Sequence, residues 1–255
     1  MNDFSNKMVM ITGASSGIGL EFARVFAQEG CHLILVARSS DKLHQAANEL
    51  GVPCEVLPAD LSKEDEVRRI AEIAKGQGVD ALINCAGFGI LGTEAETSLS
   101  DELSMIQLNV VAMHMLTKTF LPQLCEKNSG AILNVASVAG LLPGGPHMNT
   151  YYATKAYVAS FTEGLACELR ESGSDVYVGA LCPGPVKTNF MVNAGATEGF
   201  GIGVEECVAY AMKKMRKGKT LIVPSAKVRF GLFMTRFLPR SLVLKFVGSF
   251  QKNKK

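Results

Sequence analysis

The stretch TGASSGIG, residues 12–19, follows a short apolar run at 7–12 and precedes a segment with helical periodicity. Gly13, Gly17 and Gly19 therefore stand where a strand turns into a helix. Such a turn must be tight, must let a pyrophosphate approach the backbone, and must pack its helix close to the sheet. The free N–H groups and partial positive charge at the start of that helix suit phosphates. This GxxxGxG spacing is a variant of the dinucleotide-binding fingerprint, although glycines also mark turns that bind nothing.

Outward from this turn, short apolar runs alternate with segments of helical periodicity. The runs lie at 7–12, 32–37, 54–59, 79–84, 131–137, 176–182 and 220–224. The helical patterns lie near 18–29, 41–50, 63–75, 100–125, 151–172 and 204–217, and left-handed glycines are expected after three of them, at Gly30, Gly51 and Gly173. Because the runs are continuously apolar, the strands are expected to be buried on both faces. The alternation predicts an α/β fold: a Rossmann-type, doubly wound parallel sheet of about seven strands, with helices on both faces.

The length of 255 residues and the lack of a linker or repeat predict a single domain, 1–255. Its core is expected at 7–224, followed by a basic, amphipathic C-terminal helical extension at 225–255. The seven cysteines form no CxxC pair and most sit in apolar runs, which indicates buried side chains in a reducing compartment and no metal site. With neither a secretory signal nor an apolar run of membrane-spanning length, a cytoplasmic protein is expected.

The net charge of +2 conceals an uneven distribution. All 24 acidic residues lie at or before Glu206, so the first 206 residues, with 13 basic side chains, carry a net charge of −11. The remaining residues hold 13 lysines and arginines and no acid. Such an asymmetry indicates an anionic ligand or surface. No nucleic-acid motif accompanies the basic segment, so no nucleic-acid partner is expected.

The second apolar run ends in LVARSSDKL, residues 35–43, where the choice of cofactor is expected to be made. A site that prefers NAD usually has Asp or Glu here to bind the ribose 2′-hydroxyl. This chain has Ala37 followed by Arg38, and a guanidinium can pair bidentately with a 2′-phosphate. The pattern favours NADP(H) over NAD(H). The alternative is that Arg38 is an ordinary solvated side chain and both cofactors are accepted.

Further motifs follow in order along the chain. They are AD at 59–60, NCAG at 84–87, Asn109 in QLNVV, Ser137 in NVASVAG, YYATK at 151–155 and PGPVKT at 183–188. Together with the glycine turn, they resemble the motifs of the short-chain dehydrogenase/reductase family over roughly residues 7 to 224. The placing of Ser137 fourteen residues before Tyr151 makes the resemblance specific. One departure is Cys85, where the family often has a second Asn or an Ala.

The resemblance implies a role for each matching residue. The implied catalytic residues are Asn109, Ser137, Tyr151 and Lys155. Asn109 would kink its helix and help to hold a water-linked proton relay. Asp60 would lie against the adenine, Asn84 would support the central sheet and the adenosine side, and Thr188 would meet the nicotinamide carboxamide. The implied cofactor-binding residues are Gly13, Ser15, Ser16, Gly17, Ile18, Gly19, Arg38, Asp60, Leu61, Asn84, Ala86, Gly87, Tyr151, Lys155, Pro183, Gly184, Val186 and Thr188.

The chemistry of carbonyl reduction accounts for the motif YYATK. Hydride transfer to a carbonyl needs a proton donor at the developing alkoxide, and a free tyrosine, with a pKa of about 10, exchanges protons poorly near neutrality. A nearby ammonium is expected to lower that pKa. Tyr151 and Lys155 are four apart and share a helix face, and Tyr152, three before the lysine, could also approach it. The family spacing YxxxK selects Tyr151 and leaves Tyr152 as a packing or pocket-wall residue.

These observations predict an NADP-dependent oxidoreductase that interconverts a carbonyl and a secondary alcohol. Phe190, Met191 and Phe200 flank the glycine-rich loop after PGPVKT and favour a lipophilic, hydroxysteroid-like ketone as substrate, although anchoring of the loop would equally explain them. A 3-oxoacyl-type reductase is the alternative. An alternative of another class is a catalytically silent NADP-binding scaffold or sensor.

The C-terminal extension carries apolar residues at helical spacing, interleaved with basic ones. A first set is Phe230, Phe233, Met234, Phe237 and Leu238, and a second is Leu242, Val243, Phe246, Val247 and Phe250. Pro239 separates them, and Ser241 could cap the second helix. The pattern allows two interpretations. The helices either lie at the surface of an anionic membrane or border the mouth of the substrate pocket, or their apolar faces pack on the protein's own core or on a dimer partner. A homodimer or homotetramer is expected, because the segment 151–172 is apolar over most of its surface and the family often pairs subunits through this helix.

Overall fold

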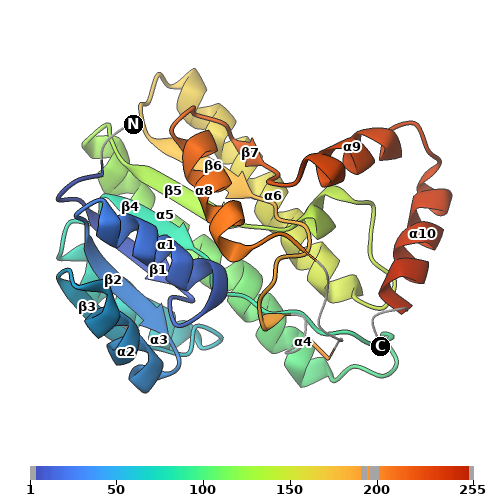
Figure 1. Cartoon of the computed structure of the whole chain (residues 1–255), viewed down its shortest axis with the longest axis horizontal. Helices are drawn as coiled ribbons and strands as arrows, with labels where there is room; N and C mark the ends of the chain where they lie inside the picture. The colour runs from blue at the N-terminus through green and yellow to red at the C-terminus, as the bar shows by residue number, and fades with distance from the viewer. Residues whose placement is uncertain (1–3, 191–193, 196–200, 253–255) are drawn as a thin grey trace.

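The computed structural model describes residues 4–190, 194–195 and 201–252. Within them, seven parallel strands form one sheet in the order β3-β2-β1-β4-β5-β6-β7 (Figure 1). The strands are β1 Met8–Thr12, β2 His32–Ala37, β3 Cys54–Pro58, β4 Ala81–Asn84, β5 Ala131–Val135, β6 Tyr177–Leu181 and β7 Leu221–Ile222. The strand order reverses between β1 and β4, as it does in a doubly wound fold. The predicted Rossmann-type parallel sheet is confirmed.

Helices cover both faces of this sheet, and further helices lie beside it (Figure 1). They are α1 Gly17–Gln28, α2 Ser40–Leu50, α3 Glu64–Lys75, α4 Leu99–Ile106, α5 Met113–Glu126, α6 Asn149–Glu171, α8 Val204–Met215, α9 Ala226–Thr235 and α10 Arg240–Lys252, with a 3-10 turn η2 at Val138–Leu141. On one face, α1, α2 and α8 share a core that includes Phe22, Phe26 and Leu43. On the other, α3, α5 and α6 share a core that includes Ile70 and Phe120. Alternate side chains of each strand enter the two cores, which explains the continuously apolar runs.

The helix predicted at 100–125 is present but is not uniform. The chain runs from α4 through a π-helical segment, η1 Gln107–Ala112, and on into α5. This wider turn contains Asn109, the residue at which the resemblance implied a kink. Single π turns inside α-helices are frequent at functional sites.

The C-terminal extension forms the two helices α9 and α10, which stand to one side of the sheet (Figure 1). The N–H groups of Leu242 and Val243 bond to the carbonyl oxygen of Pro239, so α10 starts at Arg240. Ser241 therefore lies inside the first turn, and its predicted role as the cap is wrong. Proline suits a helix start because the N–H that it lacks would have no partner there.

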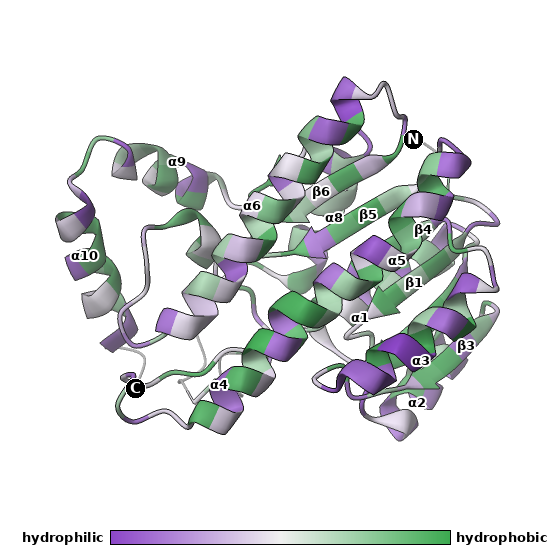
Figure 2. Cartoon of the chain, turned by 180° about the vertical axis from the view of Figure 1, so that it is seen from behind, coloured by the Kyte–Doolittle hydropathy of each residue, from purple (hydrophilic) through white to green (hydrophobic). Residues whose placement is uncertain are grey.

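The apolar stripe predicted along α9 and the turn after it faces outward rather than toward the core. Phe230, Phe233 and Phe237 are exposed, whereas Val228 and Leu232 pack against the core cluster beside β6. Packing on the protein's own core is therefore wrong as an explanation of these three phenylalanines. Figure 2 shows hydrophobic and hydrophilic segments alternating along α9 and α10. Within the described residues, none of the helices combines the length and the apolar character needed to cross a membrane.

Candidate active site

The turn between β1 and α1 has the geometry of a phosphate cradle. Gly13 and Gly17 have φ angles of +68° and +54°, in the left-handed region that favours glycine. A side-chain carbon at Gly19 would overlap the carbonyl oxygen of Gly13, so helix and strand are as close as the backbone allows. Ser16 makes no side-chain cap hydrogen bond, and the first turn of α1 holds no acid. The N–H groups of this turn, which also contains Ser15 and Ile18, thus suit the phosphates of a dinucleotide.

The ends of β1 and β4 are joined beside this turn. The Thr12 hydroxyl accepts hydrogen bonds from the N–H groups of Cys85 and Ala86, each at 3.0 Å. A side-chain carbon at Gly13 would lie 3.0 Å from the Ala86 nitrogen. Ala86 therefore stands against the glycine turn, with Gly87 next to it, at the carboxyl edge of the sheet. Open α/β folds bind their ligands at this edge.

Asn84, which was also predicted to bind the cofactor, turns its side chain into the protein interior. Its amide nitrogen donates to Asn134 Oδ1 at 2.9 Å and to Thr117 Oγ1 at 3.2 Å. Asn134 in turn donates to Thr162 Oγ1 at 3.0 Å. This buried network joins β4 and β5 to α5 and α6. Asn84 therefore supports the central sheet, and its neighbours in the chain are better placed than its amide to meet a cofactor.

A charged corner lies at the ends of β2 and β3. Arg38 is exposed and lines an open depression of about 390 Å³ together with Asp60 and Lys63. Burial alone raises the pKa of Asp60, but hydrogen bonds from Ser62 and the charges of Arg38 and Lys63 outweigh it and lower the pKa below its usual value. Leu61 is buried behind this corner. The corner holds a guanidinium, an ammonium and a carboxylate side by side at the ends of β2 and β3.

The segment after β6 approaches the glycine turn from the other side. A side-chain carbon at Gly17 would lie 3.3 Å from Thr188 Cγ2. The Thr188 hydroxyl donates to the Val186 carbonyl oxygen at 3.5 Å. Pro183 is buried and Gly184 half-buried at the start of the same segment. The predicted residues of PGPVKT thus lie beside the same sheet edge as the phosphate cradle.

Helix α6 carries Tyr151 and Lys155 one turn apart on a buried face, at 8% and 4% exposure. The Lys155 ammonium donates to the Val135 carbonyl oxygen at 2.9 Å and lies 5.9 Å from the centroid of the Tyr151 ring. Ser137, just beyond β5, donates its hydroxyl to the Pro183 carbonyl oxygen at 3.5 Å and is near enough to Tyr151 to lower its pKa. Its hydroxyl also accepts from the Ala139 N–H at 3.1 Å. The structure therefore brings Ser137, Tyr151 and Lys155 together at the carboxyl end of β5.

Asn109 reaches the same group from the π turn. Its side chain exchanges two hydrogen bonds with the Phe88 backbone, at 3.1 and 2.9 Å, and donates to Thr154 Oγ1 at 3.1 Å. A side-chain carbon at Gly87 would lie 2.9 Å from Asn109 Oδ1 and 3.3 Å from Lys155 Nζ. Gly87 therefore lies between the Asn109 amide and the Lys155 ammonium. The four predicted catalytic residues form one connected group.

Burial dominates the ionisation of this group. It raises the pKa of Tyr151 to about 12, against a smaller lowering by the hydrogen bond with Ser137. It lowers the pKa of Lys155 to about 8. The prediction that Lys155 lowers the pKa of Tyr151 is therefore wrong for the chain alone. The ammonium is itself desolvated and is hydrogen-bonded to the Val135 carbonyl oxygen. At neutral pH Tyr151 is protonated, the form that can donate a proton to a carbonyl oxygen.

Tyr152 is engaged elsewhere. Its hydroxyl accepts a hydrogen bond from Gln251 Nε2 of α10 at 2.7 Å. Its ring fills the space beside Gly145, where a side-chain carbon would overlap it. Tyr152 thus packs α6 against the loop before it and against the C-terminal helix.

Apolar side chains surround Tyr151. Met105, Ala139 and Met148 are buried in the same cluster, and the Phe190 ring centroid lies 5.5 Å from that of Tyr151. Met191 and Phe200, which were predicted to flank this region, lie outside the described residues. The surroundings of the tyrosine hydroxyl are therefore largely hydrocarbon.

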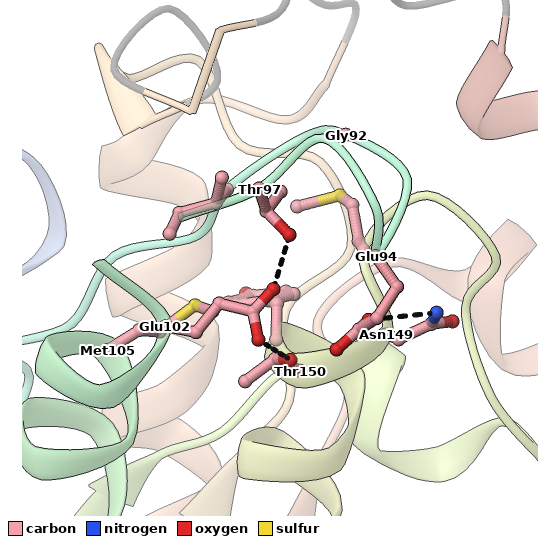
Figure 3. A pocket seen from close by; sticks show the side chains of 10 residues that line it. Gly92, Glu94, Thr97, Glu102, Met105, Asn149 and Thr150 are labelled. Carbon is pink, nitrogen blue, oxygen red and sulfur yellow. Dashed lines mark hydrogen bonds between the residues drawn. The ribbon is translucent and has the colours of Figure 1, made fainter. Parts of the chain in front are cut away.

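A small cavity of about 10 Å³ lies beside the first turn of α6 (Figure 3). Within it, Glu102 of α4 accepts hydrogen bonds from the hydroxyls of Thr150, at 3.1 Å, and Thr97. Glu94 accepts from Asn149 Nδ2 at 3.2 Å. Carboxylates stabilise a helix N-terminus, so these contacts fix the turn that presents Tyr151.

Four residues of the site escaped the sequence analysis. They are Lys63 in the charged corner, Asn134 and Thr154 in the buried hydrogen-bond networks, and Gln251 against Tyr152. Asn134 carried a signal, because an amide inside the apolar run AILNV must find buried partners. The other three are polar residues in ordinary helical surroundings, and only the tertiary structure brings them to the site.

A phosphate-binding turn and a buried Ser–Tyr–Lys group on one edge of a doubly wound sheet are the features of a nicotinamide-dependent oxidoreductase acting on alcohols or carbonyls. Comparison with known proteins agrees. The family model described as short chain dehydrogenase matches residues 7–199. The chain belongs to the short-chain dehydrogenase/reductase family.

Individual relatives cover nearly the whole chain. The ketoacyl reductase HetN of Nostoc sp. is 33% identical over 228 residues, which are 86% of this chain and 78% of HetN. A short-chain dehydrogenase from Sphingobium yanoikuyae, solved in complex with NADPH, has a TM-score of 0.82 at 32% identity and covers 90% of this chain and 93% of its own. A short-chain dehydrogenase/reductase from Burkholderia phymatum, solved in complex with NAD, has a TM-score of 0.83 at 26% identity, with 91% and 93% covered. The structural relatives thus include complexes with either nicotinamide cofactor.

Proposed function

We propose that this chain is an NADP-dependent oxidoreductase that interconverts a carbonyl and a secondary alcohol, with Tyr151 as the acid/base. The observation that carries the proposal is the connected group of Asn109, Ser137, Tyr151 and Lys155, in which the tyrosine and the lysine are almost completely buried. Burying such polar groups costs stability. A buried cluster with shifted pKa values beside a cofactor cradle is best explained by catalysis.

Each residue of the group has a role in this reaction. Bound NADP(H) supplies or accepts the hydride. Tyr151 donates its proton to the carbonyl oxygen during reduction, and Ser137 hydrogen-bonds the same oxygen. Lys155, whose pKa burial lowers to about 8, exchanges protons near neutrality and so suits the return of a proton to Tyr151. Asn109 holds Thr154 and the Phe88 backbone in place through its side-chain hydrogen bonds.

Arg38 supports NADP(H) over NAD(H) as the cofactor. Its guanidinium lies at the end of β2, where Ala37 replaces the acid that would repel a 2′-phosphate. Lys63 lines the same depression and adds a second positive charge. The glycine turn at 12–19 would hold the pyrophosphate, the segment 84–87 would flank the adenosine side, and the segment 183–188 would flank the nicotinamide half.

The apolar cluster around Tyr151 supports a lipophilic, hydroxysteroid-like ketone as the substrate. Met105, Met148 and Phe190 offer hydrocarbon surface next to the proton donor. A 3-oxoacyl thioester is the second candidate, and the ketoacyl reductase among the relatives favours it.

Turnover of NADPH with a panel of carbonyl compounds tests the proposal. Consumption of NADPH with bulky ketones is expected, and a preference for 3-oxoacyl thioesters would favour the second candidate. A catalytically silent scaffold or sensor would bind NADPH and reduce none of them, and that result would refute the proposed activity.

Three further proposals concern organisation and location. Residues 1–255 form one domain, with a core at 7–224 and an extension at 225–255. The chain assembles as a homodimer or homotetramer through α5 and α6, which present an exposed cluster where the Tyr157 hydroxyl lies 2.8 Å from His114 Nδ1. The protein is cytoplasmic and makes a peripheral membrane contact through the extension.

A further inference from the structure

The C-terminal helices expose large apolar side chains. Phe230, Phe233, Phe237 and Phe246 are between 52% and 68% exposed. The rings of Phe233 and Phe237 pack edge to face with their centroids 5.3 Å apart. These four residues are called here the outer surface of the extension. Large aromatic side chains gathered in one exposed region mark a site of contact with another molecule.

Both helices are nevertheless anchored on the protein by their other side. In α9, Val228 and Leu232 pack against the core cluster beside β6. Arg229 donates to the Val223 carbonyl oxygen at 2.7 Å and to the Tyr210 hydroxyl at 2.8 Å. The outer surface is therefore held in a defined place, and its exposure does not result from a detached helix.

Basic side chains accompany the outer surface. Lys227, Arg236, Arg240 and Lys245 are exposed on α9 and α10, and no acid follows Glu206. Aromatic and basic residues on one exposed helical surface are typical of helices that lie in the interface of an anionic membrane. A second copy of this chain would bring the same positive charges to a two-fold contact, where they repel. The charge therefore favours anionic lipid over another copy as the partner.

We infer that the outer surface docks on an anionic phospholipid bilayer and thereby holds the wall of the substrate site at the lipid surface. The link is α10. Its Val247 packs in the apolar cluster that contains Tyr151, and its Gln251 is bonded to Tyr152. A lipophilic ketone dissolved in the bilayer then enters the site without crossing bulk water. The docking stands on the outer surface alone, and this delivery rests on the proposed function.

Co-sedimentation of the full chain with vesicles tests the docking. The chain is expected to pellet with vesicles of phosphatidylcholine and phosphatidylglycerol, and to bind pure phosphatidylcholine at least tenfold more weakly. Binding to the anionic vesicles should weaken as salt is added, because salt screens charge. A chain that stays in the supernatant with anionic vesicles at low salt would overturn the inference.

Two variants divide the apolar from the electrostatic contribution. Phe233→Ser/Phe237→Ser should lower the affinity for anionic vesicles at least tenfold. Arg236→Gln/Arg240→Gln/Lys245→Gln should lower it by roughly a hundredfold, since each basic residue near an anionic surface contributes roughly fivefold. Unchanged affinity in both variants would overturn the inference.

A matched control uses α4. Leu99 and Leu103 are 72% and 56% exposed, so Leu99→Ser/Leu103→Ser removes apolar side chains of similar exposure from another surface. This variant should bind vesicles as the wild type does, and an equal loss would refute the assignment to α9 and α10. Light scattering on Phe233→Ser/Phe237→Ser adds a further test. Dissociation of an oligomer in this variant, without any vesicle binding by the wild type, would assign the surface to a second copy.

Activity measurements keep the two proposals apart. Phe233→Ser/Phe237→Ser should reduce a water-soluble ketone at the wild-type rate and a vesicle-dissolved ketone at least tenfold more slowly. Equal rates on the vesicle-dissolved ketone would refute the delivery of substrate from the bilayer. If the wild type reduces no ketone at all, the proposed function fails, and sedimentation still decides the docking.

Discussion

The carboxyl edge of the sheet and the C-terminal helices depart from the usual relation between hydropathy and burial in opposite directions. At the sheet edge, Asn109 and Lys155 are 2% and 4% exposed. In the turn just after α9, Phe237 is 68% exposed. Between the two regions, the strands follow the usual relation, with Val9, Met10 and their neighbours buried on both faces of the sheet.

The two departures indicate two kinds of ligand. A buried amide or ammonium loses hydration that only good hydrogen bonds offset, so natural proteins place such groups where chemistry needs them. An exposed aromatic surface gains no stability within its own chain, so it indicates a partner outside the chain. The sheet edge therefore fits a small molecule and the extension fits a surface. Matched substitutions in the two regions can therefore test the small-molecule ligand and the membrane surface independently of each other.

The largest effect is expected at Tyr151. Tyr151→Phe removes only the hydroxyl, so kcat for ketone reduction should fall by a factor on the order of 10²–10⁴ while NADPH binding is retained. Tyr152→Phe is the matched control, because it removes the neighbouring hydroxyl that is bonded to Gln251 of α10. It should keep most of the activity. Steady-state kinetics and NADPH titration measure both variants, and equal losses of kcat would contradict the assignment of Tyr151.

The second effect concerns how stability depends on pH. Lys155 has a pKa of about 8 in the folded chain, below its ordinary 10.5, because burial disfavours the ammonium. Below pH 8 both the folded and unfolded chains hold this proton, so the whole penalty is present. As the pH rises from 8 toward 10.5, the folded chain releases the proton first and the penalty disappears. This change should add roughly 3 kcal/mol to the free energy of unfolding.

Denaturant titrations across this pH range isolate the contribution of Lys155. Lys155→Met removes the titrating group, so its free energy of unfolding should lack the rise seen in the wild type. Lys245→Met, on the exposed side of α10, is the control and should keep the wild-type pH dependence. The same rise in Lys155→Met would show that burial of this lysine is not its source.

The third effect is on cofactor affinity, and it should distinguish Arg38 at the sheet edge from Arg236 in the extension. Arg38→Leu should weaken NADPH binding by roughly ten- to a hundredfold, because a charge-assisted contact contributes about 1.5–3 kcal/mol, and should leave NADH binding nearly unchanged. Arg236→Leu removes the same charge from α9 and should leave both cofactor affinities unchanged. Fluorescence titration of both cofactors gives these dissociation constants. A wild type that binds NADH more tightly than NADPH would contradict the role given to Arg38.

Much of the sheet edge could be predicted from the sequence, because apolar runs and glycines mark its strands and turns directly. Each apolar run became a strand, and Gly30, Gly51 and Gly173 have φ angles of +77°, +66° and +71° as expected after helices. Backbone requirements of this kind are local, so a single residue type reveals them. The pairing of Asn84 with Asn134 is not local, since it depends on β4 lying beside β5.

The extension was harder to predict because helical periodicity does not say which side faces the protein. Phe230, Phe233 and Phe237 form a stripe, yet Val228 and Leu232 on another side of α9 make the contact with the core. Both stripes are apolar, and only the packing of α9 beside β6 determines which of them faces the protein. Gln251 carried no signal at all, because its burial depends on the Tyr152 hydroxyl supplied by α6.

The smallest effect is expected where the two regions meet, between Gln251 and Tyr152. The bond of 2.7 Å is buried, and within the described residues Gln251 Oε1 has no hydrogen-bond partner. Gln251→Leu removes that unsatisfied oxygen but also deprives the Tyr152 hydroxyl of its donor, so it should cost about 1 kcal/mol. Tyr152→Phe leaves the whole buried amide unsatisfied and should cost somewhat more, about 1.5 kcal/mol.

The double variant Gln251→Leu/Tyr152→Phe replaces both partners by apolar groups. Its loss of stability should be smaller than the sum of the two single losses, with a coupling energy of about 1 kcal/mol measured by denaturant unfolding. Vesicle binding should be the same in all three variants, since none alters the outer surface. An additive cycle would show that this bond does not hold α10 on α6. The link from the bilayer to the site would then rest on the apolar contact of Val247 in the Tyr151 cluster.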